Sequence, residues 1–205
     1  MPLILLVRHG ENDYVKERRL PGRIPGIHLN KRGRKQAKRV AKFLKSTPVK
    51  AVYSSPLERT METAQPIAKA HALQVVPREG LIETDVGKWQ GKKIKNLQKL
   101  DAWRKIQLNP SRFRFPGGER IEDGQHRFVQ EIEHLAEVHA PLDMIVCVSH
   151  ADPIKMIVAY YLGLPLDMFQ RLSVSPASIT PLIIGEFGSH LLALNYDLSL
   201  TFAKD

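Results

Sequence analysis

Three short apolar runs most constrain what this chain can fold into. They are Leu3–Val7, Ala51–Tyr53 and Met144–Val148, and they alternate with segments in which apolar residues recur at helical spacing. Continuous apolar runs of this length are typical of strands that helices cover on both faces, as in parallel sheets. The alternation therefore predicts an α/β fold, a three-layer α/β/α sandwich with a mostly parallel central sheet.

The C-terminal part predicts an antiparallel edge for this sheet. Ile179–Ile184 and Leu191–Tyr196 are mainly apolar, and they bracket a segment, Gly185–His190, that contains two glycines. This order is typical of a hairpin. We therefore expect two antiparallel strands at one side of the parallel strands.

The region from Val86 to about Gln125 differs from the rest of the chain. It is basic, and turn residues recur in it at Asn109, Pro110 and Pro116–Gly118. We expect a short helix and loops here, a small cap inserted over the sheet at about 86–125. The 205 residues are expected to form a single domain, since this length gives one sizeable core.

The charge of the chain predicts attraction to anions. Lys and Arg number 31 against 21 Asp and Glu, a formal net charge of +10. Lys31–Lys50 holds nine basic residues and no acidic one, so a nucleic-acid-binding protein without catalysis is one hypothesis. Against it, Ala37, Val40 and Leu44 have the spacing of a buried helix face, with Asn30 as N-cap. This pattern favours a solvated basic helix face over a nucleic-acid partner.

The sequence also bears on the compartment. A single cysteine cannot form an internal disulfide or a cysteine-based zinc site. The first apolar stretch ends at Arg8 and His9, too early for a signal peptide, and no apolar run approaches the roughly 18 residues of a membrane span. We therefore expect a cytoplasmic protein without a membrane partner.

Polar side chains follow each predicted parallel strand. Arg8 and His9 follow the first strand, Ser55 and Arg59 the second, and His150 the third. Ligands of open parallel sheets bind at the carboxyl ends of the strands, beside helix N-termini. Two arginines, whose guanidinium groups bind phosphate oxygens in bidentate fashion, and two histidines at these ends predict a phosphoryl site.

Local signals predict where the helices after these strands begin. Ser55 and Glu58 have the spacing of a capping box, and Pro56 stands at the first helical position. We therefore expect a helix to begin at Ser55, and Pro66 should kink or shorten it. Pro153 marks the first turn of the helix that follows the third strand.

In these motifs the sequence resembles the histidine phosphatase superfamily, with its phosphoglycerate mutase-like fold, over nearly the whole chain. The motifs are, in order, Arg8-His9-Gly10-Glu11; Leu29, Gly33, Gln36 and Ala37; Ser54-Ser55-Pro56-Leu57-x-Arg59-x-x-x-Thr63-Ala64; Leu81-x-Glu83-x-Asp85-x-Gly87-x-Trp89-x-Gly91; and Pro116-Gly117-Gly118-Glu119. One departure follows His150, where Ala151 and Asp152 replace the usual two glycines. This departure alters the floor of the substrate pocket.

The resemblance implies a histidine acid phosphatase-like or phosphoglycerate mutase-like enzyme that needs no metal and no cofactor. His9 would be the nucleophile, and Arg8, Arg59 and His150 would bind the phosphoryl group. Glu83 would protonate the leaving group and then accept a proton from water. Burial should raise the pKa of Glu83 and nearby arginines should lower it, and the sequence leaves open which effect is larger.

Three further residues are expected to contact the substrate. Asn12 would donate a hydrogen bond, Arg23 lies in a turn near the first motif, and Ala151 follows His150. We expect hydrolysis of a small phosphorylated metabolite, because the chain is short for the mutase branch. A cofactor-dependent phosphoglycerate mutase-type phosphotransferase is the alternative, and the resemblance leads us to expect a homodimer.

Overall fold

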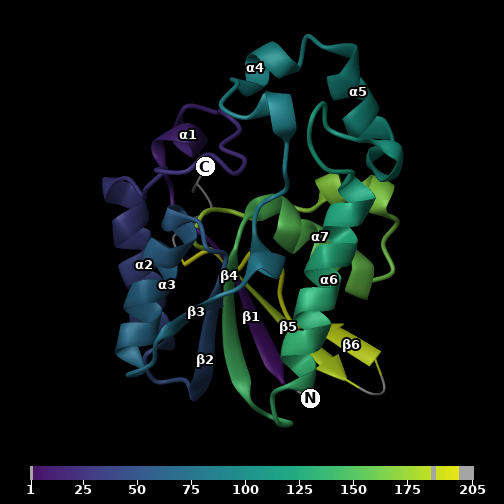
Figure 1. Cartoon of the computed structure of the whole chain (residues 1–205). Coiled ribbons are helices and arrows are strands. Elements are labelled where there is room, and N and C mark those ends of the chain that lie inside the picture. The colour runs from purple at the N-terminus through teal and green to yellow at the C-terminus, as the bar shows by residue number, and fades with distance from the viewer. Residues whose placement is uncertain (1, 186–187, 199–205) are drawn as a thin grey trace, which may run out of the picture.

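The computed structural model describes residues 2–185 and 188–198 (Figure 1). Its centre is a six-stranded sheet in the order β3-β2-β4-β1-β5-β6. The strands are β1 (Leu3–Arg8), β2 (Val49–Ser54), β3 (Val75–Pro77), β4 (Met144–Ser149), β5 (Ile179–Gly185) and β6 (Gly188–Leu191). β1 to β4 pair in parallel, and β5 and β6 pair antiparallel. The predicted mostly parallel sheet with an antiparallel edge is confirmed.

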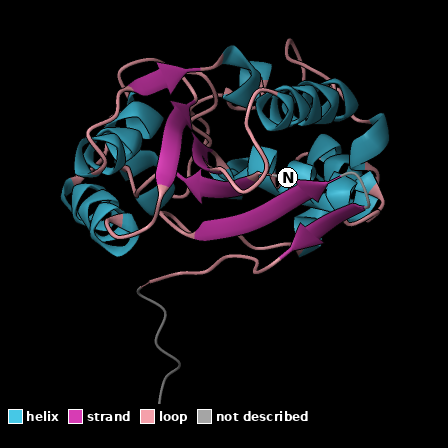
Figure 2. Cartoon of the chain, turned by 90° about the horizontal axis from the view of Figure 1, so that it is seen from below, coloured by secondary structure: helices cyan, strands magenta, loops and turns pink. Residues whose placement is uncertain are grey.

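Helices cover both faces of this sheet, as Figures 1 and 2 show. The α-helices are α1 (Asp13–Lys16), α2 (Lys31–Leu44), α3 (Glu58–Ala70), α4 (Ile94–Leu97), α5 (Asp101–Leu108), α6 (Ile121–Glu137) and α7 (Ala151–Tyr161). The 3₁₀ turns are η1 (Glu79–Leu81), η2 (Gly87–Trp89), η3 (Pro110–Arg112) and η4 (Leu166–Arg171). Within the described ranges, no helix has the length and apolar character that crossing a membrane requires.

The alternation of side chains along β1 builds two cores. Ile4 and Leu6 belong to the cluster that packs beneath α6 and α7, whereas Leu5 and Val7 belong to the cluster beneath α2 and α3. Successive residues of a strand point to opposite faces, so an uninterrupted apolar strand buries both. Each of these side chains contributes roughly 1.5–3 kcal/mol of burial free energy. The predicted three-layer sandwich is confirmed.

The basic helix α2 has the two faces that its sequence predicts. Asn30 Oδ1 accepts a hydrogen bond from Gly33 N at 2.9 Å and caps the helix. Val40 and Leu44 are buried against the sheet layer. The basic side chains on the other face are exposed, namely Lys31, Arg32, Arg34, Lys35, Lys38, Arg39 and Lys42.

The expected start of α3 at Ser55 is wrong. The helix begins at Glu58 with Leu57 as N-cap, and no side chain caps it. The reason is that Ser55 continues the strand direction, since its N–H donates to Val148 O at 2.9 Å. This backbone N–H is therefore not free to donate to the Glu58 carboxylate, as a capping box requires. α3 also continues through Pro66 to Ala70, so the proline does not shorten it.

The sheet edges are less regular than the apolar patterns predict. β3 is a three-residue strand that ends at Pro77, too short for a clear sequence signal. Of the expected strand Leu191–Tyr196, only Leu191 lies in β6. The chain then turns at Asn195, which has φ of 57°, and Tyr196 returns to Ile179 as an isolated bridge. Residues 186 and 187 of the expected hairpin turn lie outside the described residues.

The segment between η2 and α6 folds at the same end of the sheet as α1, as Figure 1 shows. It forms two short helices, α4 and α5, where the sequence predicted one. Its aromatic side chains pack together and belong to the same core cluster as Ile4 and Leu6: the ring centroid of Trp89 lies 5.9 Å from that of Trp103 and 5.4 Å from that of Phe115. Ring pairs at these distances attract each other beyond their burial alone.

Candidate active site

β1 and β4 are neighbours in the sheet and bring two histidines together. Arg8 pairs with Ser149 in parallel register, and His9 N donates to Ser149 O at 2.9 Å. The next residue after β4 is His150, and the ring centroids of His9 and His150 are 5.2 Å apart. Parallel strands that end at one edge of a sheet thus place residues 141 positions apart in sequence side by side.

The imidazole of His9 is buried and has one nitrogen free. His9 is 2% exposed, and its Nδ1 lies 2.7 Å from Gly10 O. A carbonyl oxygen can only accept, so Nδ1 carries the proton and Nε2 carries the lone pair. Burial lowers the pKa of His9 well below its ordinary value, and the charges of Arg59 and Arg8 lower it further. The ring is therefore neutral, and Nε2 can act as a nucleophile.

The turn that follows His9 is held by α2 and α3. A Cβ at Gly10 would lie 2.6 Å from Gly33 O, so a side chain at this position would collide with α2. Gly10 N donates to Thr63 Oγ1 at 3.0 Å, and that hydroxyl donates to Arg59 O at 2.7 Å. The same contacts therefore fix the backbone beside the His9 ring and the turn of α3 that carries Arg59.

Two arginines carry buried positive charge into the site. Arg59, in the first turn of α3, is fully buried and donates from Nη2 to Gly22 O at 2.7 Å. Arg8 donates from Nη1 to Val174 O at 2.6 Å. Burial lowers the pKa of both guanidinium groups, while the carboxylate of Glu83 opposes this shift. Among the described residues, Arg59 Nε and Nη1 and Arg8 Nε are buried donors without a hydrogen-bond partner.

His150 connects this group to Glu83. It precedes α7 as the N-cap residue and is fully buried. Its Nε2 lies 2.9 Å from Ser55 Oγ, and its Nδ1 lies 3.7 Å from Glu83 Oε2. Burial lowers the pKa of His150 well below its ordinary value, and the positive charge of Arg59 lowers it further. The two histidines of the site are therefore both neutral imidazoles.

The pKa of Glu83 resolves the question that the sequence left open. Burial raises it to about 7, and the nearby carboxylate of Asp152 adds to the increase, whereas Arg59 and Arg8 lower it. Desolvation therefore outweighs the arginines. Glu83 Oε1 also accepts from Thr84 N at 2.9 Å. A carboxyl with a pKa near neutral pH can both give and take a proton there.

The three expected substrate contacts have different surroundings. Asn12 is fully buried; its Oδ1 accepts from Val15 N at 2.8 Å, and its Nδ2 has no partner. Arg23 donates from Nε to Glu83 O at 2.8 Å, so its guanidinium is directed to the segment that carries Glu83. Ala151 is half-buried at the start of α7. Their role as substrate contacts stays a prediction.

Sequence reasoning missed some of the contacts that build this site. Ser55 was expected as a helix cap, but its hydroxyl pairs with His150. Ser149 donates to Leu81 O at 2.8 Å and ties β4 to the segment before Glu83. Ser149 directly follows a predicted strand and Ser55 lies two residues after another, and this position is the signal that could have identified them.

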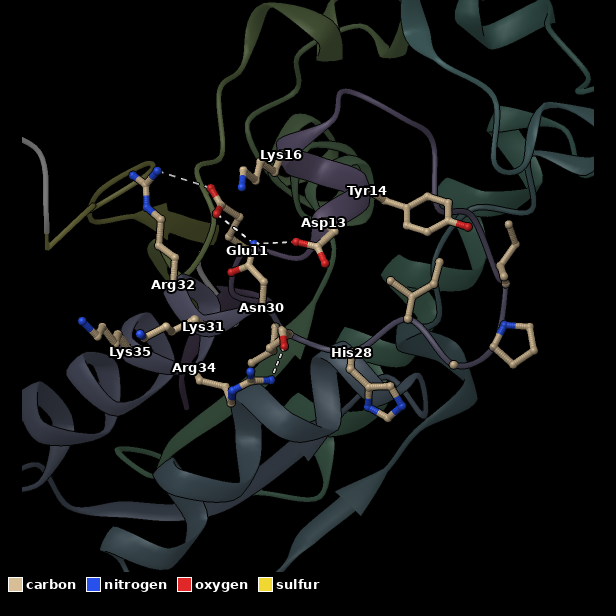
Figure 3. Close-up of a pocket in the computed structure, with 15 residues that line it drawn as sticks. Glu11, Asp13, Tyr14, Lys16, His28, Asn30, Lys31, Arg32, Arg34 and Lys35 are labelled. Carbon is tan, nitrogen blue, oxygen red and sulfur yellow. Dashed lines mark hydrogen bonds and ion pairs between the residues drawn. The ribbon is translucent and has the colours of Figure 1, made fainter.

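A separate hollow of about 970 Å³ lies between α1, residues 24–30 and the first turns of α2. Figure 3 shows Arg32 directed to Glu11, and Asn30 between Glu11 and Asp13. Its lining contains none of the five proposed catalytic residues. Its one histidine, His28, is paired with Glu62 at 2.5 Å. The hollow is therefore separate from the buried cluster of His9, Arg59 and His150 at the strand ends.

A doubly covered α/β sheet with neutral histidines, buried arginines and a carboxyl of raised pKa at its strand ends defines a class of phosphoryl-transfer enzyme. The sequence profile of the histidine phosphatase superfamily (branch 1) matches residues 4–197, and the chain belongs to this family of phosphatases and phosphoglycerate mutase-like enzymes. The fold and the family that the sequence motifs predict are thereby confirmed.

Relatives of two kinds are similar to this chain. Phosphoserine phosphatase 1 of Hydrogenobacter thermophilus is 31% identical over 197 residues, which cover 95% of this chain and 92% of that protein. A 2,3-bisphosphoglycerate-dependent phosphoglycerate mutase of Thermoplasma acidophilum is 31% identical over 184 residues, 88% of this chain and 86% of that protein. A mutant phosphoserine phosphatase of Entamoeba histolytica, solved in complex with phosphoserine, superposes with a TM-score of 0.88 at 27% identity and covers 98% of this chain and 100% of that one.

Proposed function

We propose that this protein is a metal-independent phosphomonoester hydrolase that acts through a phosphohistidine intermediate. The observation that carries the proposal is the set of buried donors around His9. Of the ten buried side-chain polar atoms without a partner in the described residues, five belong to Arg8, Asn12, Arg59 and His150. Such atoms are costly unless an acceptor meets them. The oxygens of a phosphoryl group are acceptors that also carry the opposite charge.

In the first step, His9 Nε2 attacks phosphorus and forms an N–P bond. The bond between phosphorus and the leaving oxygen breaks, its electron pair stays on that oxygen, and the Glu83 carboxyl supplies the proton. Arg8 and Arg59 stabilise the charge on the nonbridging oxygens as it develops. The proton on His9 Nδ1 stays in its hydrogen bond to the Gly10 carbonyl.

In the second step, water attacks the phosphohistidine. The Glu83 carboxylate accepts a proton from this water, the N–P bond breaks, and His9 returns to the neutral imidazole. Inorganic phosphate leaves. A pKa of about 7 lets one carboxyl serve as acid and then as base near neutral pH. No step requires a metal ion, because the arginines supply the positive charge.

We further propose hydrolysis, with a small phosphorylated metabolite as substrate, over phosphoryl transfer to a second hydroxyl. A mutase must hold its bisphosphate intermediate in a closed pocket while it reorients. In this chain the segment proposed as the cap is small: it holds α4 and α5, of four and eight residues, the 3₁₀ turns η2 and η3, and the first residues of α6. Phosphoserine and phosphoglycerates are the first substrates to test, since relatives of both kinds are named for them.

The test is release of phosphate from 4-nitrophenyl phosphate and from phosphoserine in the presence of a chelator. Wild type should turn over both, and His9→Ala should release none. A rapid quench in alkali should trap phosphate on wild type, which later acid treatment releases, and none on His9→Ala. A wild type without turnover, or unchanged release by His9→Ala, contradicts the proposal. Transfer from one hydroxyl of phosphoglycerate to the other without loss to water supports the mutase alternative.

Three further expectations remain proposals. We propose the cytoplasm as the compartment, consistent with the single Cys147, which is buried and unpaired. We propose a homodimer, to be measured by light scattering. We also propose that residues 1–205 are one domain with 86–125 as its cap, which limited proteolysis would cut first.

A further inference from the structure

Three charged side chains form an ion-pair network beside the segment that carries Glu83. The carboxylate of Glu119, just before α6, accepts from Arg23 Nη2 at 3.2 Å and from Arg127 Nη2 at 3.0 Å. The side chains of Glu119, Arg23 and Arg127 are 17%, 31% and 26% exposed. Water therefore screens these charges less than on an open surface. We call these three residues the Glu119 network.

The network holds the backbone before Glu83. Arg127 Nη1 donates to Gly80 O at 3.2 Å and to Ile82 O at 3.0 Å. Arg127 lies in the middle of α6, and its guanidinium also lies 4.3 Å from the ring centroid of Phe128. The guanidinium group of Arg127 is therefore held in one position, because few rotamers of its side chain satisfy all of these contacts.

The network also holds Glu83 itself and the residues after it. Arg23 Nε donates to Glu83 O at 2.8 Å, and Glu119 Oε1 accepts from Asp85 N at 2.8 Å. Glu119 N in turn donates to Asp85 O at 3.0 Å. A Cβ at Gly118 would lie 2.3 Å from Asp85 O, so only glycine permits this close approach of the two loops.

We propose that the Glu119 network positions the proton donor of the reaction, by fixing the backbone on both sides of Glu83 and by balancing the charge around its carboxyl. The inference rests on the proposed function of Glu83. Regular secondary structure ends at η1, two residues before Glu83, and resumes at η2. The side-chain contacts of the Glu119 network, together with the backbone bond from Glu119 N to Asp85 O, therefore hold this stretch. Glu119, Arg23 and Arg127 are positioning residues, since they act through Glu83.

The charges around Glu83 give the network a second effect. The charged and titratable groups that interact with Glu83 are His150, Arg8, Arg59, Asp152, Arg127 and Arg23, the last through its hydrogen bond to Glu83 O. Glu119 balances Arg127 and Arg23. Replacing Glu119 by glutamine leaves both cations unbalanced, which favours the Glu83 carboxylate and lowers the pKa of Glu83. Replacing Arg127 by glutamine removes a cation and raises that pKa.

The first experiment compares Glu119→Gln with wild type on two substrates. An alkyl phosphate such as phosphoserine needs its leaving oxygen protonated, whereas 4-nitrophenolate leaves without a proton. We expect Glu119→Gln to lower kcat/KM about tenfold on phosphoserine and less than twofold on 4-nitrophenyl phosphate, since kcat/KM reports only formation of the phosphohistidine and small misplacement of a reacting group is costly. The matched control is Glu122→Gln, on the same turn but 63% exposed, which should match wild type on both substrates.

The second experiment measures the pH dependence of kcat/KM on phosphoserine. The basic limb of this profile reports loss of the protonated acid. We expect the limb to move to lower pH in Glu119→Gln and to higher pH in Arg127→Gln. Arg127→Lys retains the positive charge and loses the several N–H donors of the guanidinium group. It should therefore lower kcat/KM on phosphoserine without moving the basic limb of the pH profile. Opposite shifts are not what a merely structural role would produce.

The outcomes separate this inference from the proposed function. A wild type that traps no phosphate on His9 overturns both. A wild type that traps phosphate, with equal losses on the two substrates or an unmoved limb in Glu119→Gln and Arg127→Gln, overturns the network alone. Circular dichroism and thermal melting identify a variant that does not fold. If Glu119→Gln or Arg127→Gln does not fold, Arg127→Lys is measured in its place. Activity of Arg127→Lys on phosphoserine equal to that of wild type would contradict the positioning role.

Discussion

Positive charge is placed in two contrasting ways in this protein. Arg59 is fully buried, with two guanidinium nitrogens that have no partner, whereas Lys35 and Lys38 of α2 are exposed to water. An unpaired buried charge costs several kcal/mol, so it persists only where function requires it. Exposed charges are solvated and screened within about 10 Å at 0.1 M salt. The net charge of the chain therefore says little about its proposed reaction, whereas the buried Arg59 and the partly buried Arg8 bear on it directly.

The strongest way to test this contrast is to remove one charge of each kind. Arg59→Met should lower kcat/KM about 10³-fold, because one preorganised donor to a developing charge is worth about 10²–10³. Lys38→Met, the matched control on the exposed face of α2, should leave kcat/KM unchanged. Steady-state kinetics on 4-nitrophenyl phosphate measures both. A loss below tenfold in Arg59→Met would place the phosphoryl group elsewhere.

Binding of inorganic phosphate sharpens the same comparison without turnover. Phosphate at ten times its Kd should raise the free energy of unfolding of wild type by about 1.4 kcal/mol, through binding to the folded state alone. Arg59→Met should lose this stabilisation, and without phosphate it should be no less stable than wild type, because it no longer buries an unpaired charge. Thermal melting with and without phosphate measures the effect. Equal stabilisation of Lys38→Met and Arg59→Met by phosphate would contradict it.

The strand-end residues could be predicted because their placement follows from local sequence and one rule of parallel sheets. Once β1 and β4 are recognised as buried strands, Arg8, His9 and His150 must lie at one edge. The error at Ser55 shows where such reasoning fails. Its capping pattern is a local signal, but the residue pairs with Val148 and His150, which are distant in sequence. Tertiary contacts decided between two uses of the same side chain.

The support of Glu83 could not be predicted for a similar reason. Glu119, Arg127 and Arg23 come from three segments that meet only in the folded chain, and no spacing rule connects them. In the sequence, Arg127 has the pattern of an ordinary charged residue on the polar face of an amphipathic helix. The pKa of Glu83 was equally out of reach, because burial and the neighbouring Asp152 decide it. Motifs thus indicate which residues react, and the fold determines how they are held and charged.

A charge of intermediate exposure should give an intermediate effect. The side chain of Asp152 is 37% exposed, and its carboxylate raises the pKa of Glu83. Asp152→Asn removes this repulsion, so the pKa of Glu83 falls and the protonated acid is lost at lower pH. We expect the basic limb of kcat/KM to move down by less than one pH unit, with activity at pH 8 reduced a few-fold. Asp123→Asn, 60% exposed on α6, is the control. An upward shift of the limb in Asp152→Asn would contradict the assignment of Glu83 as the acid.

The smallest effect is expected from the exposed charges of α2. A variant with Lys31, Lys35 and Lys38 all replaced by glutamine should change kcat/KM less than twofold at 0.15 M salt, because these side chains are solvated and contact no proposed catalytic residue. At 0.01 M salt the Debye length reaches about 30 Å, and loss of steering should lower kcat/KM by a few-fold. The defect of Arg59→Met should not depend on salt in this way, since a buried charge is screened little. A gel-shift titration at low salt completes the comparison. Tight DNA binding by wild type that the triple variant loses would show that the exposed charges have a partner of their own, separate from the phosphoryl site.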